Sequence, residues 1–160
     1  MKRAVPEHTS DDVKGIVYGL SMGRNKTPYA AQVPGKAVEL IKAVRAQLDM
    51  IDPNFRFTSI QLVVNGRTGL HVDQGNVGDS RAISLGPPVG GMLCVHSQDD
   101  ADFQVSSPGS WFAFDGRRPH LVLPFAGERV AIVAYCHSGV FSAAARPYID
   151  MLTRHGVQAA

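Results

Sequence analysis

The chain has few cysteines, no long hydrophobic run and little net charge. Its two cysteines among 160 residues exclude a disulfide-dense secreted scaffold and a cysteine-rich zinc module. No apolar stretch reaches the roughly 18 residues of a membrane-spanning helix, and the basic start Met1-Lys2-Arg3 is not followed by the apolar core of a signal peptide. The formal net charge of +2 permits an anionic partner without requiring one. We therefore expect a soluble, intracellular monomer, cytoplasmic or nuclear, that is neither secreted nor bound to a membrane.

What is present is the composition of an ordinary globular domain. Hydrophobic residues make up 44% of the chain and charged residues 19%, and a chain of this length predicts one domain over 1–160. Between Pro34 and Pro53, apolar side chains recur at helical spacing, which predicts an N-terminal helix. The recurring apolar residues are Val38, Ile41, Val44, Leu48 and Ile51.

After residue 55 the apolar period changes to two, which is typical of strands. Many short, regularly spaced strands separated by turn residues predict a sandwich, jelly roll or barrel. The expected loops are 23–32 and 74–80, the second a substrate lid, and a short C-terminal helix is expected at 147–155. The expected strands are 14–22, 57–65, 69–73, 81–85, 91–96, 102–105, 110–114, 120–124 and 128–137. The predicted fold class is mainly β (α+β), a jelly-roll or cupin-like barrel over about 55–137 with one packed N-terminal helix.

His71, Asp73 and His120 are the candidate metal ligands. His71 and Asp73 are two residues apart, so on a strand their side chains point to the same face, and His120 opens a later strand. Two imidazoles and one carboxylate form the facial triad of non-haem Fe(II) oxygenases, which leaves further coordination positions open. Each residue taken alone is more often a surface or hydrogen-bonded side chain, so the spacing by itself leaves metal binding open.

Arg129 is the candidate ligand-binding cation. The turn residues at 125–127 predict a hairpin that places His120 and Arg129 on adjacent antiparallel strands. The strand expected at 128–137 is apolar on both faces, so Arg129 is expected to be buried. A buried arginine needs an anionic partner, which would be either a ligand carboxylate or a distant acid such as Asp115.

Two amides, Gln61 and Asn65, share one face of the strand expected at 57–65. Amides on one face indicate a polar cavity inside the barrel. The other interpretation is that this face is the solvent side of an antiparallel sheet.

The order His-x-Asp, His and Arg resembles that of the Fe(II)/2-oxoglutarate-dependent oxygenases. The resemblance covers about residues 55–137 and the preceding helix, and it implies a double-stranded β-helix. It implies that Arg129 pairs the distal carboxylate of 2-oxoglutarate. Gln61 and Asn65, from their shared strand face, are expected to bind the co-substrate in the same cavity. Molecular oxygen would be the second co-substrate and ascorbate the reductant in vitro. The implied iron ligands are His71, Asp73 and His120.

Within this superfamily the sequence looks most like a minimal catalytic core of the TET/JBP group, which oxidises the 5-methyl group of pyrimidines in nucleic acid. Residues 71–76 (HVDQGN) fit the group's His-x-Asp-x-x-Asn, and 129–137 (RVAIVAYCH) resemble its last core strand. Leu85-Gly86 followed by Gly90-Gly91 and Leu93 resembles the strand pair between the ligands. The resemblance implies a base-binding set in which two residues contact the target base and one lines its pocket: Asn76, His137 and Tyr135, respectively.

The implied reaction is hydroxylation of 5-methylcytosine in DNA, with thymine and RNA left open. Ala131 departs from the group, which commonly has a serine there that helps to bind 2-oxoglutarate. The other functions considered are the same chemistry on a protein side chain or small metabolite, a non-oxygenase cupin-like metal barrel, and a metal-free binding module. Several basic residues are expected either to contact phosphates or to be scattered solvated charges: Lys2, Arg3, Lys14, Arg24, Lys26, Arg117 and Arg118.

Overall fold

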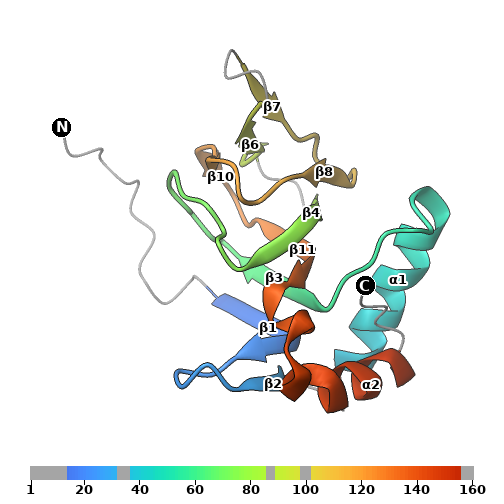
Figure 1. Ribbon diagram of the computed structural model, residues 1–160. Helices are drawn as coiled ribbons and strands as arrows, with labels where there is room; N and C mark the ends of the chain where they lie inside the picture. The colour runs from blue at the N-terminus through green and yellow to red at the C-terminus, as the bar shows by residue number, and fades with distance from the viewer. Residues whose placement is uncertain (1–13, 32–36, 86–88, 98–101, 156–160) are drawn as a thin grey trace.

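The computed structural model describes residues 14–31, 37–85, 89–97 and 102–155, and it is mainly β with two α-helices on one side (Figure 1). The helices are α1 (Ala37–Ile51) and α2 (Arg146–Arg154), with the 3-10 turns η2 (Ser138–Phe141) and η3 (Ala143–Ala145) before α2. The strands are β1 (Lys14–Met22), β2 (Pro28–Ala31), β3 (Ser59–Val64), β4 (Asn76–Leu85), β5 (Val89–Gly90), β6 (Leu93–His96), β7 (Phe103–Val105), β8 (Phe112–Phe114), β9 (His120–Val122), β10 (Phe125–Ala126) and β11 (Val130–His137).

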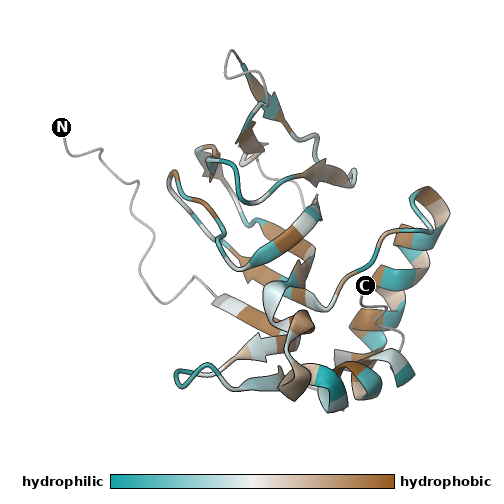
Figure 2. Ribbon diagram, viewed as in Figure 1, coloured by the Kyte–Doolittle hydropathy of each residue, from teal (hydrophilic) through white to brown (hydrophobic). Residues whose placement is uncertain are grey.

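The larger sheet has six antiparallel strands in the order β2-β1-β3-β11-β4-β8. Its centre is β11, which has no exposed residue and is therefore covered on both faces, as its apolar sequence predicts. Figure 2 shows hydrophobic residues concentrated in the central strands and polar residues in the β1–β2 turn. One face of this sheet meets the helices, and the other meets a cavity described below.

The helix α1 packs its apolar stripe on the outer face of the six-stranded sheet. Ile41, Val44 and Leu48 are buried in one cluster with Ile60 of β3 and Ala134 of β11. The predicted helix is therefore confirmed, with its last turn just before Pro53, which cannot continue it. The residues around its expected start, Pro34 and Gly35, lie outside the described part of the chain.

The smaller sheet has three strands in the order β7-β6-β9, and a two-stranded ribbon joins β10 to β5. Ala82 of β4, Phe114 of β8 and Val95 of β6 form a second buried cluster between the two sheets. Within the described residues, the hydrogen-bonded ladders form these separate sheets and do not close into one barrel. No helix in the described part of the chain has the length and apolar character to cross a membrane.

Several sequence-based boundaries are wrong. Residues 28–31 of the expected loop 23–32 form β2, because Pro28 can begin an edge strand that needs no N–H from it. The expected strand 69–73 is reduced to one bridge between His71 and His120, and the expected lid 74–80 is mostly the start of β4. β9 and β11 lie in different sheets, so His120 and Arg129 do not stand on adjacent strands as predicted.

Candidate metal centre and adjoining cavity

The structure brings His71, Asp73 and His120 together at one end of a cavity. One ligand atom from each residue lies within 4.8 Å of the others. His71 and His120 exchange backbone hydrogen bonds, each N–H donating to the other's carbonyl oxygen at 3.0 Å. Asp73 is held separately, because its backbone N–H donates to the carbonyl oxygen of Gly116 at 2.8 Å. Three backbone hydrogen bonds therefore set the spacing of the candidate ligands.

The hydrogen bonds of the two imidazoles decide which nitrogen atoms are available to a metal. His71 Nδ1 lies 2.8 Å from the carbonyl oxygen of Gly69, and His120 Nδ1 lies 2.7 Å from that of Arg118. A carbonyl oxygen only accepts, so Nδ1 carries the proton in each ring and the lone pair of the neutral ring is on Nε2. Both Nε2 atoms face Asp73, at 3.6 and 3.5 Å from its carboxylate oxygens. This is the arrangement in which metal-binding histidines are oriented by a second hydrogen bond.

The electrostatics of this end favour a positive charge between the rings. Burial by itself lowers the pKa of His120, but the hydrogen bond and charge of Asp73, with the carbonyl of Arg118, raise it overall. The His120 side chain is 5% exposed, whereas Asp73 and His71 are 38% and 36% exposed. The cluster therefore has one buried wall and one open side, from which a cation and its further ligands can approach.

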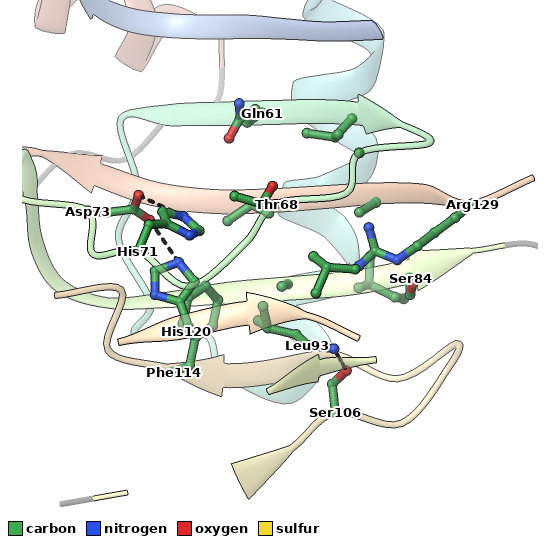
Figure 3. A pocket seen from close by; sticks show the side chains of 17 residues that line it. Gln61, Thr68, His71, Asp73, Ser84, Leu93, Ser106, Phe114, His120 and Arg129 are labelled. Atoms are coloured by element: carbon green, nitrogen blue, oxygen red, sulfur yellow. Dashed lines mark hydrogen bonds and ion pairs between the residues drawn. The ribbon is translucent and has the colours of Figure 1, made fainter. Parts of the chain in front are cut away.

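The cavity that continues from the cluster has a volume of about 110 Å³, which is enough for several waters or a small ligand. Figure 3 shows the cluster at one end of the cavity and Arg129 at the other. The wall comes from both sheets and from the 66–73 segment. Its residues are Gln61, Val63, Gly66, Thr68, His71, Asp73, Ala82, Ile83, Ser84, Leu93, Ser106, Phe114, His120, Val122, Arg129, Ala131 and Val133.

Arg129 is buried, with 5% of its surface exposed, and burial lowers its pKa. Its Nε donates to the carbonyl oxygen of Gly91 at 2.7 Å, which leaves Nη1 and Nη2 for another partner. Arg129 forms no ion pair with any carboxylate in the described part of the chain. Asp115, the intramolecular partner considered from the sequence, instead pairs with Arg117 at 2.8 Å. The alternative of an Arg129–Asp115 pair is therefore wrong.

The two amides predicted in the cavity are placed differently. Gln61 lines the cavity from β3. Asn65 is absent from the described cavity wall, and its Oδ1 accepts a hydrogen bond from the backbone N–H of Arg129 at 2.8 Å. Asn65 has a positive φ of 55°, which asparagine tolerates better than most residues. It thus supports the backbone that carries Arg129.

Asn76, His137 and Tyr135 lie at the metal end, away from Arg129. His137 pairs with Asn76 in the β11–β4 register. Gly116 has Asp73 Oδ2 and Asn76 Nδ2 within 3.1 and 3.2 Å of where its Cβ would lie, so Asn76 is close to the metal cluster. Burial raises the pKa of Tyr135, and the charge of Asp73 adds to this, while a hydrogen bond with Ser59 opposes it.

Three site-supporting residues were missed by sequence reasoning. Gly91 and Gly116 hold Arg129 and Asp73 through their carbonyl oxygens, and a Cβ on either would meet the residue it holds. Ser84 faces Ala131 in the strand register and lines the cavity. The glycines stand in turn sequences, but which carbonyl meets which side chain depends on long-range packing that no local pattern reveals.

Comparison with solved structures identifies the class of fold. The structure of NgTET1 in complex with 5mC DNA matches with a TM-score of 0.62 at 13% identity, over 80% of this chain and 62% of that one. An oxidoreductase of the 2OG-Fe(II) oxygenase family from Burkholderia pseudomallei matches with a TM-score of 0.60 at 19% identity, over 82% of this chain and 71% of that one. The chain thus spans about 62% of the length of the NgTET1 chain. No protein-family model matches the sequence, and no curated protein matches it.

The fold is that of the 2OG-Fe(II) oxygenases. Within that fold, His71, Asp73 and His120 form a candidate His-Asp-His iron site.

Proposed function

We propose that residues 1–160 form a double-stranded β-helix domain that acts as an Fe(II)/2-oxoglutarate-dependent dioxygenase on the 5-methyl group of 5-methylcytosine in DNA. The observation that carries the proposal is one cavity with two chemically opposite ends. Metal-ligand atoms lie at one end, and at the other lies a buried arginine that has no carboxylate partner among the described residues. 2-Oxoglutarate has a chelating 2-oxo acid group and a distal carboxylate, so it complements both ends.

The donor set fits ferrous iron. Two imidazole Nε2 atoms and one carboxylate would hold Fe(II), and their neighbours already orient them. When bound, iron and 2-oxoglutarate would supply the oxidising chemistry: one oxygen atom of O2 enters the substrate C–H bond and the other enters succinate as CO2 leaves. The protein would contribute position, electrostatics and a dry environment.

Arg129 would fix the distal carboxylate. Its Nη1 and Nη2 form a fork that matches a carboxylate in a two-point contact, and Figure 3 shows the guanidinium directed into the cavity. Burial lowers the pKa of Arg129 because it disfavours the charged guanidinium, and an anion bound there would offset that cost.

Ala131 lacks the hydroxyl that a serine commonly supplies at this position to help bind 2-oxoglutarate. We assign that function to Ser84. The two residues are directly paired between β4 and β11, and both line the cavity. Directly paired residues on one face have Cβ atoms about 5 Å apart. The Ser84 Oγ has no hydrogen-bond partner in the described part of the chain, so its hydroxyl can donate to the carboxylate that Arg129 holds.

His137 favours a cytosine rather than a thymine base. Gly139 donates its backbone N–H to His137 Nδ1 at 2.9 Å, and burial lowers the pKa of His137, so the neutral ring carries its proton on Nε2. His137 therefore presents a donor. Cytosine N3 is an acceptor, whereas thymine N3 carries a hydrogen and repels a donor. The fold likeness to NgTET1, solved with 5mC DNA, supports the same class of substrate.

The position of the base site also requires a particular form of substrate. Asn76, Tyr135 and His137 lie at the metal end of β11, and Arg129 precedes its other end, so base and co-substrate would approach the metal from opposite sides. A methyl group inside a stacked duplex cannot reach such a site, so the base would be flipped out or come from a single strand.

The proposal is tested with anaerobically iron-loaded protein, 2-oxoglutarate, ascorbate and oligonucleotides that contain 5-methylcytosine, in single- and double-stranded forms. The DNA is digested to nucleosides and searched by mass spectrometry for 5-hydroxymethylcytosine. We expect product with wild type and with Asp102→Ala, an exposed control, and none with Asp73→Ala. Succinate without a DNA product would redirect the assignment to a protein or small-molecule substrate. Neither succinate nor product from iron-containing protein would reject the oxygenase proposal.

A further inference from the structure

A second arginine, Arg67, lies close to Arg129 without sharing its role. Its guanidinium carbon lies 4.3 Å from the centre of the Phe125 ring, and that of Arg129 lies 6.0 Å from the same ring. Arg67 Nη2 donates to the carbonyl oxygen of Phe125 at 3.2 Å, while its Nε is buried and has no hydrogen-bond partner in the described ranges. A buried donor without a partner is energetically costly, so its presence needs a reason.

Arg67 stands on the wall of an opening of about 480 Å³ beside the cavity. The opening lies between β1 and β3 on one side and the 66–73 segment on the other. Most of its wall also belongs to the cavity, so the two spaces adjoin. The shared residues are Gln61, Val63, Gly66, Thr68, His71 and Asp73.

The charges of this opening suit an anion. Arg67 has no ion-pair partner in the described part of the chain, and its Nη1 makes no hydrogen bond there. Gln61 and Thr68 add an amide and a hydroxyl, both without a partner among the described residues. The one acid on the wall is Asp73, which belongs to the candidate metal centre. An entering anion therefore meets an uncompensated guanidinium before it reaches Arg129.

We propose that this opening is the route by which the dicarboxylate co-substrate enters and that Arg67 captures one of its carboxylates on the way to Arg129. The inference rests on the proposed use of 2-oxoglutarate, but not on the nature of the oxidised substrate. Arg67 does not hold the final complex, because it lines the opening and is not part of the cavity wall. Its effect is thus on the rates of entry and exit and not on the Kd, because a fixed charge on the route steers an oppositely charged ligand.

The experiment follows the visible charge-transfer absorption of the iron–2-oxo acid chelate after rapid anaerobic mixing of Fe(II)-loaded protein with 2-oxoglutarate. For Arg67→Gln we expect kon and koff to fall together by about five- to tenfold, with a weaker dependence of kon on ionic strength. The Kd should therefore stay within a factor of about two, because Arg67 contacts the ligand on the route and not in the final complex. Arg67→Lys keeps the charge but not the planar fork, and it is expected to retain most of kon. Lys42→Gln removes one charge from the exposed side of α1 and is expected to change neither rate.

The outcomes separate the inference from the function on which it rests. Unchanged kon in Arg67→Gln, with normal chelate formation in wild type, overturns the capture role and leaves the oxygenase proposal standing. Loss of kon in both Arg67→Gln and Arg67→Lys also overturns it, because Arg67 would then act only through its contact with Phe125. Iron-loaded wild type that forms no chelate at all rejects the oxygenase proposal itself.

Discussion

The two ends of the cavity are built in opposite ways. At the metal end, His71 and Asp73 are more than a third exposed and lie in a segment joined to β9 by the His71–His120 bridge and one further backbone hydrogen bond. At the other end, Arg129 is buried and fixed through its side chain by Gly91 and through its backbone by Asn65. The metal end carries a carboxylate beside two imidazoles, whereas the arginine end carries a guanidinium with no carboxylate beside it among the described residues.

This difference indicates what each end needs from a ligand. The charge of Asp73 at the metal end is already compensated in part, because Asp73 and His120 stabilise each other. At the arginine end, no carboxylate among the described residues compensates the charge of Arg129, and a buried cation is costly until an anion binds. A ligand that supplies an anion to one end and a chelating group to the other would therefore satisfy both. We expect changes at the metal end to abolish metal binding and changes at the arginine end to weaken co-substrate binding in graded steps.

The largest effect is expected for Asp73→Ala. Removal of a ligand should lower iron affinity by at least about a hundredfold, since loss of residues that only support ligands already costs up to about that much. Metal content after anaerobic loading and desalting measures the change. Added Fe(II) should raise the unfolding temperature of wild type, because it binds the folded state, and should not raise that of the variant. Full iron occupancy in Asp73→Ala would show that the metal lies elsewhere.

The metal end was also the part most readable from the sequence. His71 and Asp73 are two residues apart in the sequence, and both have side chains that commonly bind metals. The triad could therefore be predicted without knowing which strands pair. The position of Arg129 opposite the triad could not be predicted correctly, because the turn at 125–127 suggested a hairpin and the chain instead crosses between two sheets. Strand neighbours are set by packing over the whole sheet, whereas the helix α1 is set by its own apolar spacing.

Arg129→Gln should weaken 2-oxoglutarate binding by about a hundredfold, because the loss of a charge-assisted two-point contact costs nearly 3 kcal/mol. Iron content should not change, since Arg129 lies at the far end of the cavity. Titration of the iron-loaded variant under anaerobic conditions gives the Kd. An unchanged Kd would contradict the proposal that the arginine end binds the carboxylate of the co-substrate while the metal end binds iron.

Gly91→Ala tests whether the arginine end is held as rigidly as its contacts suggest. A Cβ at residue 91 would lie 2.8 Å from Arg129 Cδ, and the positive φ of 74° disfavours any side chain. We expect about a tenfold weaker Kd for 2-oxoglutarate and a loss of roughly 1–2 kcal/mol in the free energy of unfolding. Gly109→Ala is the matched control, because Gly109 has the same φ of 74° with open space around its Cβ position. Equal effects of both variants on the Kd would mean that backbone strain alone, and not displacement of Arg129, is responsible.

Ser84→Ala is expected to have the smallest effect, a threefold to tenfold weaker Kd for 2-oxoglutarate, because one hydroxyl donor is worth about 1 kcal/mol. The pairing of Ser84 with Ala131 allows a sharper test than the single change. A hydroxyl placed on the other member of the pair, Ala131→Ser, would reach the same carboxylate from β11, so the double variant should recover most of the lost affinity. Iron content serves as the control, because neither residue belongs to the metal cluster. If the double variant binds as weakly as Ser84→Ala alone, then Ser84 acts through the packing of β4. In that case the arginine end binds the carboxylate through Arg129, and the Ser84–Ala131 pair does not contribute.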